Sequence, residues 1–244
     1  MTASDLDALV RRVDQDRWLA SRFAPPLVRR RLVALYALNY EIARTADVVS
    51  DRGIGLIRLA WWREALAKAS EGGSQQAHPV LRALQGAQLR LPVLNALIDA
   101  RERDFEAAPF QSWSDLEFYL DATAGGLITH AIEACGCAEP SEDIIRYAGR
   151  AWGYLGLARA EPFWRARGRS FLPQASGSLD DVIDRALGAY ARASSRALSS
   201  NAFPALGYLA LVPSYARALK RGRRETPLLE RQLKLIAAAA KGRL

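Results

Sequence analysis

Long apolar runs are absent from this sequence of 244 residues, whose mean hydropathy is −0.09. The longest uncharged apolar stretches, at 203–212 and 235–240, are much shorter than the roughly 20 residues that a membrane-spanning helix needs. The first residues, MTASDLDALVRRVDQDRW, contain acidic side chains and lack the basic segment and apolar core of a signal peptide. We therefore exclude an integral membrane protein and expect a cytoplasmic chain.

Cysteine and histidine are scarce, with two residues of each. Cys135 and Cys137 are too close together for an easy disulfide, and two thiolates are too few for a zinc site. We predict neither a metal-binding nor an acid–base role for His78 and His130. The sequence has no nucleophile-elbow motif, and the glycine pair at 125–126 lacks the other glycines of a phosphate-binding loop, so we interpret that pair as close helix packing.

Acidic residues are outnumbered by basic ones, 26 to 34, which gives a net charge of +8 and a pI near 9.9. Only four of the basic residues are lysine. They follow no nucleic-acid-binding pattern, so we expect no nucleic-acid partner. The densest basic clusters, at 29–31, 165–169 and 220–224, fit a diphosphate ligand or an anionic membrane surface better.

Strand-like alternation is also missing, and apolar residues recur at helical spacing along almost the whole chain. Hydroxyl residues three positions before an acid predict helix starts near Ser4, Ser114 and Ser178. With the proline and glycine breakers, the pattern predicts helices at roughly 5–20, 27–50, 53–71, 78–88, 92–107, 114–136, 141–160, 178–199, 203–220 and 225–241. The short gaps and the lack of repeats or linkers predict one all-α domain, 1–244, with a shared interior.

Two polar stretches are candidates for the interior of that bundle. Asp47 and Asp51 lie four positions apart at the end of the helix predicted to begin at Leu27, which places both carboxylates on one face at a spacing that can share Mg²⁺. Gly53 marks the end of that helix, so a solvated helix terminus is the competing interpretation. The Arg58–Arg63 stretch contains a tryptophan pair that is more typical of a core than of a cofactor site.

Several short motifs resemble, in order, the landmarks of the squalene/phytoene synthase family, and together they cover nearly the whole chain. They are FAPP at 23–26, ALYAL at 34–38, RLAWWREAL at 58–66, HPV at 78–80, LID at 97–99 and RGRSFLP at 167–173. The resemblance implies the all-helical isoprenoid synthase fold, a bundle around a deep cavity. It also implies two DxxxD motifs on facing helices that hold Mg²⁺ against the diphosphate of a prenyl substrate.

This sequence departs from the family at both motifs. Counted from the ALYAL landmark, the first pair of metal ligands falls on Ala43 and Asp47. Counted from the RGRSFLP landmark, the second motif falls on Gly153, Gly156, Arg159, Ala160 and Trp164, and we expect Pro162 to break its helix. Three of the four carboxylates are therefore missing. We predict that a leaving diphosphate could not be neutralised and that the chain is a non-catalytic member.

Within the family, the stretches at 37–43, 48–58 and 157–162 look most like the branch that contains the mitochondrial assembly factor for respiratory complex I. That resemblance implies a role in assembling the membrane NADH dehydrogenase, with complex I subunits as partners and a peripheral position on the inner membrane. Two alternatives stay open. One is a head-to-head prenyl transferase that uses Mg²⁺ with Asp47 and Asp51. The other is a binder of prenyl diphosphates without turnover, whose candidate contacts are Tyr36, Arg58, Arg63, Arg159 and Arg169.

Overall fold

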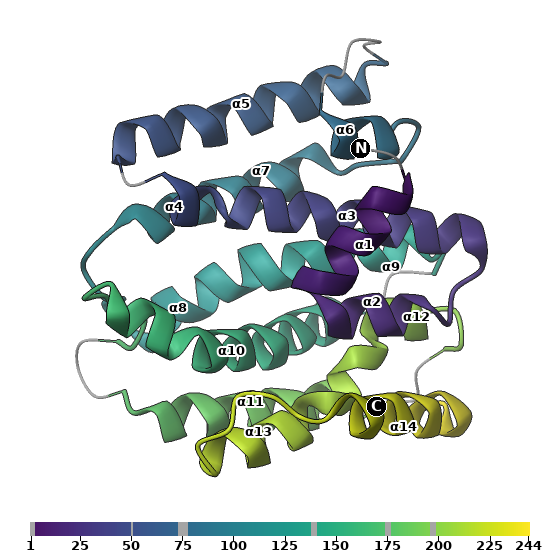
Figure 1. The fold of residues 1–244 in the computed structure, drawn as a ribbon, viewed down its shortest axis with the longest axis vertical. Helices are drawn as coiled ribbons and strands as arrows, with labels where there is room; N and C mark the ends of the chain where they lie inside the picture. The colour runs from purple at the N-terminus through teal and green to yellow at the C-terminus, as the bar shows by residue number, and fades with distance from the viewer. Residues whose placement is uncertain (1–2, 50, 73–77, 138–140, 174–176, 196–198) are drawn as a thin grey trace.

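The chain folds into packed helices in the computed structural model, which describes residues 3–49, 51–72, 78–137, 141–173, 177–195 and 199–244. Within those ranges every regular element is helical, which confirms the predicted all-α class (Figure 1). The elements are α1 (Ala3–Val13), α2 (Gln15–Ser21), α3 (Pro26–Ala43), α4 (Thr45–Val48), α5 (Arg52–Ser70), α6 (Pro79–Ala83), α7 (Leu91–Ala100), η1 (Arg101–Phe105), α8 (Trp113–Leu120), η2 (Asp121–Gly125), α9 (Gly126–Ala134), α10 (Glu142–Ala166), α11 (Leu179–Ala193), α12 (Phe203–Leu206), η3 (Gly207–Leu211), α13 (Val212–Lys220) and α14 (Leu228–Lys241).

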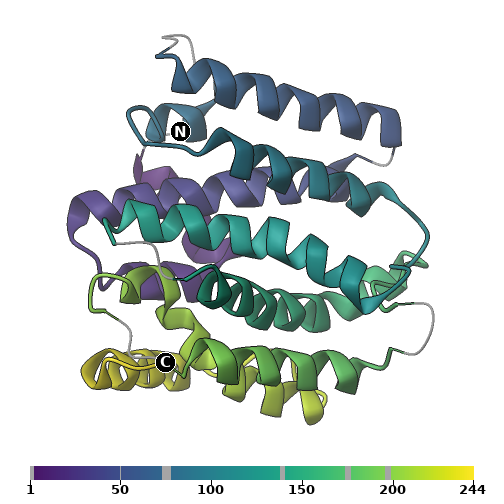
Figure 2. The ribbon, with the colours of Figure 1, turned by 180° about the vertical axis from the view of Figure 1, so that it is seen from behind.

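The helices are stacked in layers across the long axis of the molecule. Figures 1 and 2 show α5 at one end, α3 and α10 in the middle, and α11, α13 and α14 at the other end. The core contains the large side chains that are fully buried, and it is rich in aromatic residues from separate helices. They include Tyr36, Trp62, Tyr154, Tyr208 and Tyr215. Burial of this much apolar surface is the main force that holds the layers together.

The predicted helix 27–50 does not exist as one element, and this corrects the expectation for Asp47 and Asp51. Helix α3 ends at Ala43, and Asp47 lies in the short α4. Asp51 adopts an extended backbone conformation and is the N-cap of α5, where its Oδ1 accepts a hydrogen bond of 2.9 Å from the Ile54 amide. A carboxylate that caps a new helix cannot share a helical face with a residue before the break. The two aspartates are therefore not a paired motif.

The expectation that Pro162 breaks its helix is wrong. Helix α10 continues without interruption from Glu142 to Ala166, with Pro162 inside it. A proline removes one backbone donor and favours a bend, but packing can carry a helix through it. Here Trp164, in the turn after the proline, packs against the core and keeps the end of α10 in place.

Helix α10 approaches the π-helical turn η2 so closely that only glycine fits between them. A β-carbon added to Gly149 would lie 2.7 Å from the backbone nitrogen of Gly125 and 2.8 Å from its Cα. Contacts shorter than van der Waals distance with backbone atoms cannot be relieved by a side-chain rotation. This approach brings α10 next to η2 and fixes the shape of the cavity that both elements line.

Candidate functional site

A cleft of about 530 Å³ lies where the carboxyl end of α3, the short α4, η1, η2 and α10 meet. It combines polar and apolar walls, with residues from both halves of the chain. It is lined by Arg17, Asn39, Tyr40, Ala43, Arg44, Ala46, Asp47, Arg101, Asp104, Tyr119, Leu120, Thr123, Ala124, Trp152, Gly153, Gly156, Leu157, Ala160, Phe163 and Trp164.

The positions that sequence counting assigned to the two DxxxD motifs meet in this cleft. Ala43 and Asp47 lie on one wall, and Gly153, Gly156, Ala160 and Trp164 lie on the opposite wall along α10. The two segments are more than 100 residues apart in the sequence, so packing alone brings them together. The walls that face one another carry one carboxylate, Asp47, with methyl groups, glycines and an indole at the other positions.

Asp47 lines the cleft and is exposed. Partial desolvation raises the pKa of its carboxyl, and the positive charge of Arg167 acts in the opposite direction. Asp51 does not line the cleft, since it caps α5. No group of three or more His, Cys, Asp or Glu side chains in the described part of the chain is arranged to hold a metal ion. The donor set of this cleft therefore does not fit a Mg²⁺ cluster.

The second carboxylate of the cleft, Asp104, is buried and already has hydrogen-bond donors. Its Oδ1 accepts from the Tyr119 hydroxyl at 2.8 Å, and its Oδ2 lies 3.2 Å from Nη1 of Arg101. Burial raises the pKa of Asp104, and the Arg101 charge acts against that rise. A metal ion at Asp104 would have to displace Arg101 and Tyr119, so this group stabilises the wall of the cleft.

Three arginines that sequence reasoning missed supply the positive charge of the cleft. They are Arg17 from α2, Arg44 between α3 and α4, and Arg101 from η1. Arg17 is 7% exposed and lies over the rings of Tyr36, Trp152 and Tyr208, at 5.0–5.9 Å from the ring centres. Its Nη1 pairs with Asp14 at 2.8 Å, while its buried Nε has no hydrogen-bond partner. No local spacing in the sequence marks these three residues, because they come from separate elements.

The arginines that sequence reasoning selected mostly lie elsewhere. Arg63 is paired with Asp99 and Glu102, at 2.5 and 2.6 Å, between α5 and the α7–η1 segment. Arg159 lies 3.6 Å from Asp16 and over the ring of Tyr215. Neither of these arginines lines the cleft, and Arg58 does not line it either.

The two remaining candidates lie beside the cleft rather than in it. Arg169 donates a hydrogen bond of 2.7 Å to the Asp104 carbonyl and lines a small adjoining pocket with Tyr119. Tyr36 is 1% exposed beneath Arg17, and its hydroxyl has no hydrogen-bond partner. The structure thus brings Asp47, Tyr36 and Arg169 to one region of the bundle and separates Asp51, Arg58, Arg63 and Arg159 from it.

The family model and the curated proteins that match this chain point to the same family. The family model for squalene/phytoene synthases matches residues 10–176. The mouse protein "NADH dehydrogenase (ubiquinone) complex I, assembly factor 6" is 27% identical over 240 residues, which cover 87% of this chain and 72% of that protein. The rat protein of the same name is 30% identical over 169 residues, 68% of this chain and 51% of that protein. The match thus covers only about half the length of the rat relative.

Two solved structures have the same fold. A dehydrosqualene synthase in complex with a ligand superposes with a TM-score of 0.78 at 15% identity, covering 98% of this chain and 95% of that one. A squalene synthase from Alicyclobacillus acidocaldarius superposes with a TM-score of 0.63 at 22% identity, covering 98% of this chain and 94% of that one. These likenesses confirm the predicted isoprenoid synthase bundle.

Proposed function

The chain belongs to the squalene/phytoene synthase family, and we propose that it is a non-catalytic member that assists assembly of the respiratory NADH dehydrogenase, complex I. The relatives named as complex I assembly factors support the assembly role. The observation that carries the non-catalytic part is the composition of the cleft. Ala43, Gly153, Ala160 and Trp164 stand at its motif positions, where Asp47 is the only acidic side chain.

The chemistry of diphosphate ionisation explains why that composition matters. Departure of the diphosphate leaves several negative charges that must be neutralised in the transition state, and carboxylate-bound Mg²⁺ supplies that stabilisation in the enzymes of this family. Alanine, glycine and tryptophan side chains cannot hold the ion. Loss of single electrostatic groups commonly costs about 100- to 1,000-fold in rate, so loss of most of the ligand set removes turnover.

Incubation of the purified protein with farnesyl or geranylgeranyl diphosphate, Mg²⁺ and NADPH tests this proposal. We expect pyrophosphate release no faster than in a heat-inactivated sample, with a squalene synthase as the positive control. In cells of the source organism that lack the gene, we expect Asp47→Ala to restore NADH dehydrogenase levels as well as the unaltered protein does. Release that is abolished by Asp47→Ala, together with failure of that variant in cells, would establish the alternative of a prenyl transferase.

Three arginines in the cleft favour a second candidate function, the binding of a prenyl diphosphate without turnover. Arg17, Arg44 and Arg101 can meet a diphosphate with guanidinium groups, and Trp152 and Leu157 offer apolar surface next to them. Equilibrium binding of farnesyl diphosphate without pyrophosphate release in the same assay would support this candidate. Absence of binding would exclude it and leave the assembly role in place.

We further propose that the protein binds peripherally to an anionic membrane through α14. Among the residues that the structure describes, no helix is both long and apolar enough to cross a bilayer. Helix α14 turns Arg231, Leu235 and Ala238 inward and leaves Leu229 and Leu233 66% and 57% exposed. The helix lies at the edge of the bundle (Figure 1).

The exposed side chains of α14 form an apolar stripe whose neighbouring charges favour binding to a lipid surface. The stripe consists of Leu229, Leu233 and Ile236, the last of which is 57% exposed. Arg221, Arg223 and Arg224 precede α14 in the sequence, and Lys234 and Lys241 lie on it, against the two acidic residues Glu225 and Glu230. An apolar helix face flanked by lysine and arginine is the pattern of helices that bind in the interface of anionic bilayers.

Co-sedimentation with vesicles tests the role of α14. We expect binding to phosphatidylcholine vesicles that contain phosphatidylglycerol and at least about tenfold weaker binding of the double variant Leu229→Ser/Leu233→Ser, because two leucines leave the apolar phase. Ile54→Ser/Ile57→Ser is the matched control, because these residues are 58% and 70% exposed on α5, at the other end of the bundle, and this variant should bind like the unaltered protein. Equal binding of the double variant, or equal binding to vesicles of phosphatidylcholine alone, would contradict this role.

A further inference from the structure

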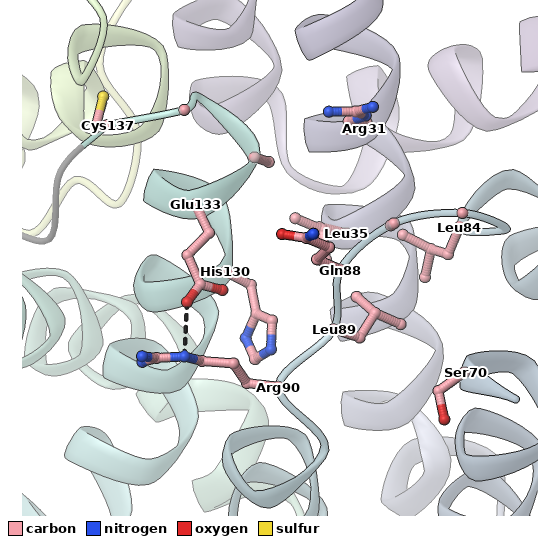
Figure 3. Close-up of a pocket in the computed structure, with 14 residues that line it drawn as sticks. Arg31, Leu35, Ser70, Leu84, Gln88, Leu89, Arg90, His130, Glu133 and Cys137 are labelled. Carbon is pink, nitrogen blue, oxygen red and sulfur yellow. Dashed lines mark ion pairs between the residues drawn. The ribbon is translucent and has the colours of Figure 1, made fainter.

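A second cavity opens beside the first half of α3 and has a volume of about 940 Å³. It is bounded by α3, the end of α9 and the segment 84–90, as Figure 3 shows. Arg31 and Leu35 line it from α3, whereas the cleft is lined from the same helix by residues from Asn39 onward, about 6 Å further along the axis. The two cavities share no lining residue in the part of the chain that the structure describes. The second cavity is therefore a separate site.

A buried histidine faces this cavity with an unused acceptor atom. His130 is 2% exposed, and its Nδ1 lies 2.9 Å from the Gly126 carbonyl oxygen. A carbonyl oxygen can only accept, so Nδ1 carries a proton, and in the tautomer protonated at Nδ1 alone Nε2 has a free lone pair. That Nε2 atom is buried and has no hydrogen-bond partner. A buried acceptor without a donor lowers stability and is uncommon in native proteins unless a bound molecule supplies the donor.

A second acceptor stands one helical turn away. Glu133 lies three residues after His130 on α9, so both side chains project from one face of the helix toward Arg90 and Leu89 (Figure 3). The Oε1 atom of Glu133 lies 2.8 Å from Nε of Arg90, whereas Oε2 is buried and has no partner. The inner wall therefore offers two neighbouring acceptors to a molecule that donates hydrogen bonds.

The charges around these acceptors select the kind of donor. Arg31 and Arg90 bring two guanidinium groups to the lining, against the single carboxylate of Glu133. This excess of positive charge disfavours an ammonium group, whereas a neutral hydroxyl meets no such repulsion. No three metal-ligating side chains among the described residues come together here either. The rest of the lining includes Leu35, Leu84 and Leu89, which suit an apolar body.

We propose that this cavity binds a small hydroxylated amphipathic molecule, an alcohol or a phenol. Its hydroxyl groups donate to Nε2 of His130 and Oε2 of Glu133, and its apolar part packs against Leu35 and Leu89. The site depends neither on the cleft nor on the role in complex I assembly. Its test uses neither pyrophosphate release nor NADH dehydrogenase levels as a readout.

Binding of two matched probes to the full chain tests the site. The diol 4-hexylresorcinol has two hydroxyl donors, and its dimethyl ether has the same apolar body without them. We expect calorimetric titration to show at least about tenfold tighter binding of the diol, since only the diol satisfies the buried acceptors. The ¹⁵N resonance of His130 Nε2 should also move when the diol binds. Equal affinities for the two probes, or an unchanged Nε2 resonance at saturation, would overturn the proposal.

Variants on α9 locate the effect at His130. We expect His130→Leu to fold at least as well as the unaltered protein, because it removes the orphaned acceptor, and to lose the preference for the diol. Thr129→Val is the matched control, because Thr129 lies on the same helix outside the cavity lining. It should keep the preference. Retention of the preference in His130→Leu would also overturn the proposal, and the Nε2 resonance of the unaltered protein decides the question if that variant fails to fold.

Discussion

Replacing Asp16 with alanine is expected to destabilise the folded protein by about 3–5 kcal/mol, because the change leaves a buried arginine without its counter-charge. Asp16 is 3% exposed in α2 and joins the two carboxyl-terminal helices to the amino-terminal segment. Its Oδ2 accepts from the Tyr215 hydroxyl at 2.7 Å, and its Oδ1 accepts from Nη1 of Arg231 at 2.9 Å. Denaturation by urea, followed by circular dichroism, measures the change in the free energy of unfolding.

Two further variants separate a buried charge network from a general loss of packing. Adding Arg231→Met to Asp16→Ala should recover part of the lost stability, because the uncompensated charge is then removed. Asp184→Ala removes an exposed partner of Lys220 and should leave the unfolding midpoint almost unchanged. A loss below about 1 kcal/mol for Asp16→Ala would show that the network contributes little to stability.

Gly149→Ala is expected to cost about 2–3 kcal/mol, although alanine is the better helix former. The added methyl group would meet the backbone of Gly125 at 2.7 Å, so α10 and η2 would have to separate. Both elements line the cleft, and the change should therefore also alter its shape. Thermal unfolding measures the stability loss.

A matched glycine on the neighbouring helix provides the control. Gly188 lies inside α11, and a β-carbon there would meet no atom within 4 Å. Gly188→Ala should therefore stabilise the protein by about 0.5–1 kcal/mol, through helix propensity and a less flexible unfolded chain. The same substitution should thus lower the free energy of unfolding at Gly149 and raise it at Gly188. Equal effects at the two positions would show that the close approach of α10 and η2 has no energetic role.

Much of the fold could be predicted from the sequence because its signals are local. Helical periodicity and capping pairs act over three or four residues, and the predicted start at Ser178 is a capping box with Asp181 in the structure. The errors lie where packing competes with a local signal. Pro162 stays inside α10, and the chain breaks after Ala43 where the apolar pattern alone would continue the helix.

The candidate site was predictable only in part. Counting from family landmarks placed Ala43, Asp47 and Ala160 at motif positions, and all three line the cleft. The candidate arginines were chosen from the motifs that surround them in the sequence. Such motifs do not indicate which face of a helix points into the bundle. Arg63 consequently pairs with Asp99 and Glu102 outside the cleft, although its motif resembles a family landmark.

Residue identity and short-range spacing are enough to specify the helical class, the family and the loss of acidic residues at the motif positions. Which side chains meet in space depends on how the helices pack. Asp16 and Arg231, 215 positions apart, form one buried network. Arg17, Arg44 and Arg101 share a cleft, and His130 faces a cavity with an acceptor that nothing in the described chain satisfies. These encounters depend on how layers of helices pack over the core, and no interaction between neighbours in the sequence specifies them.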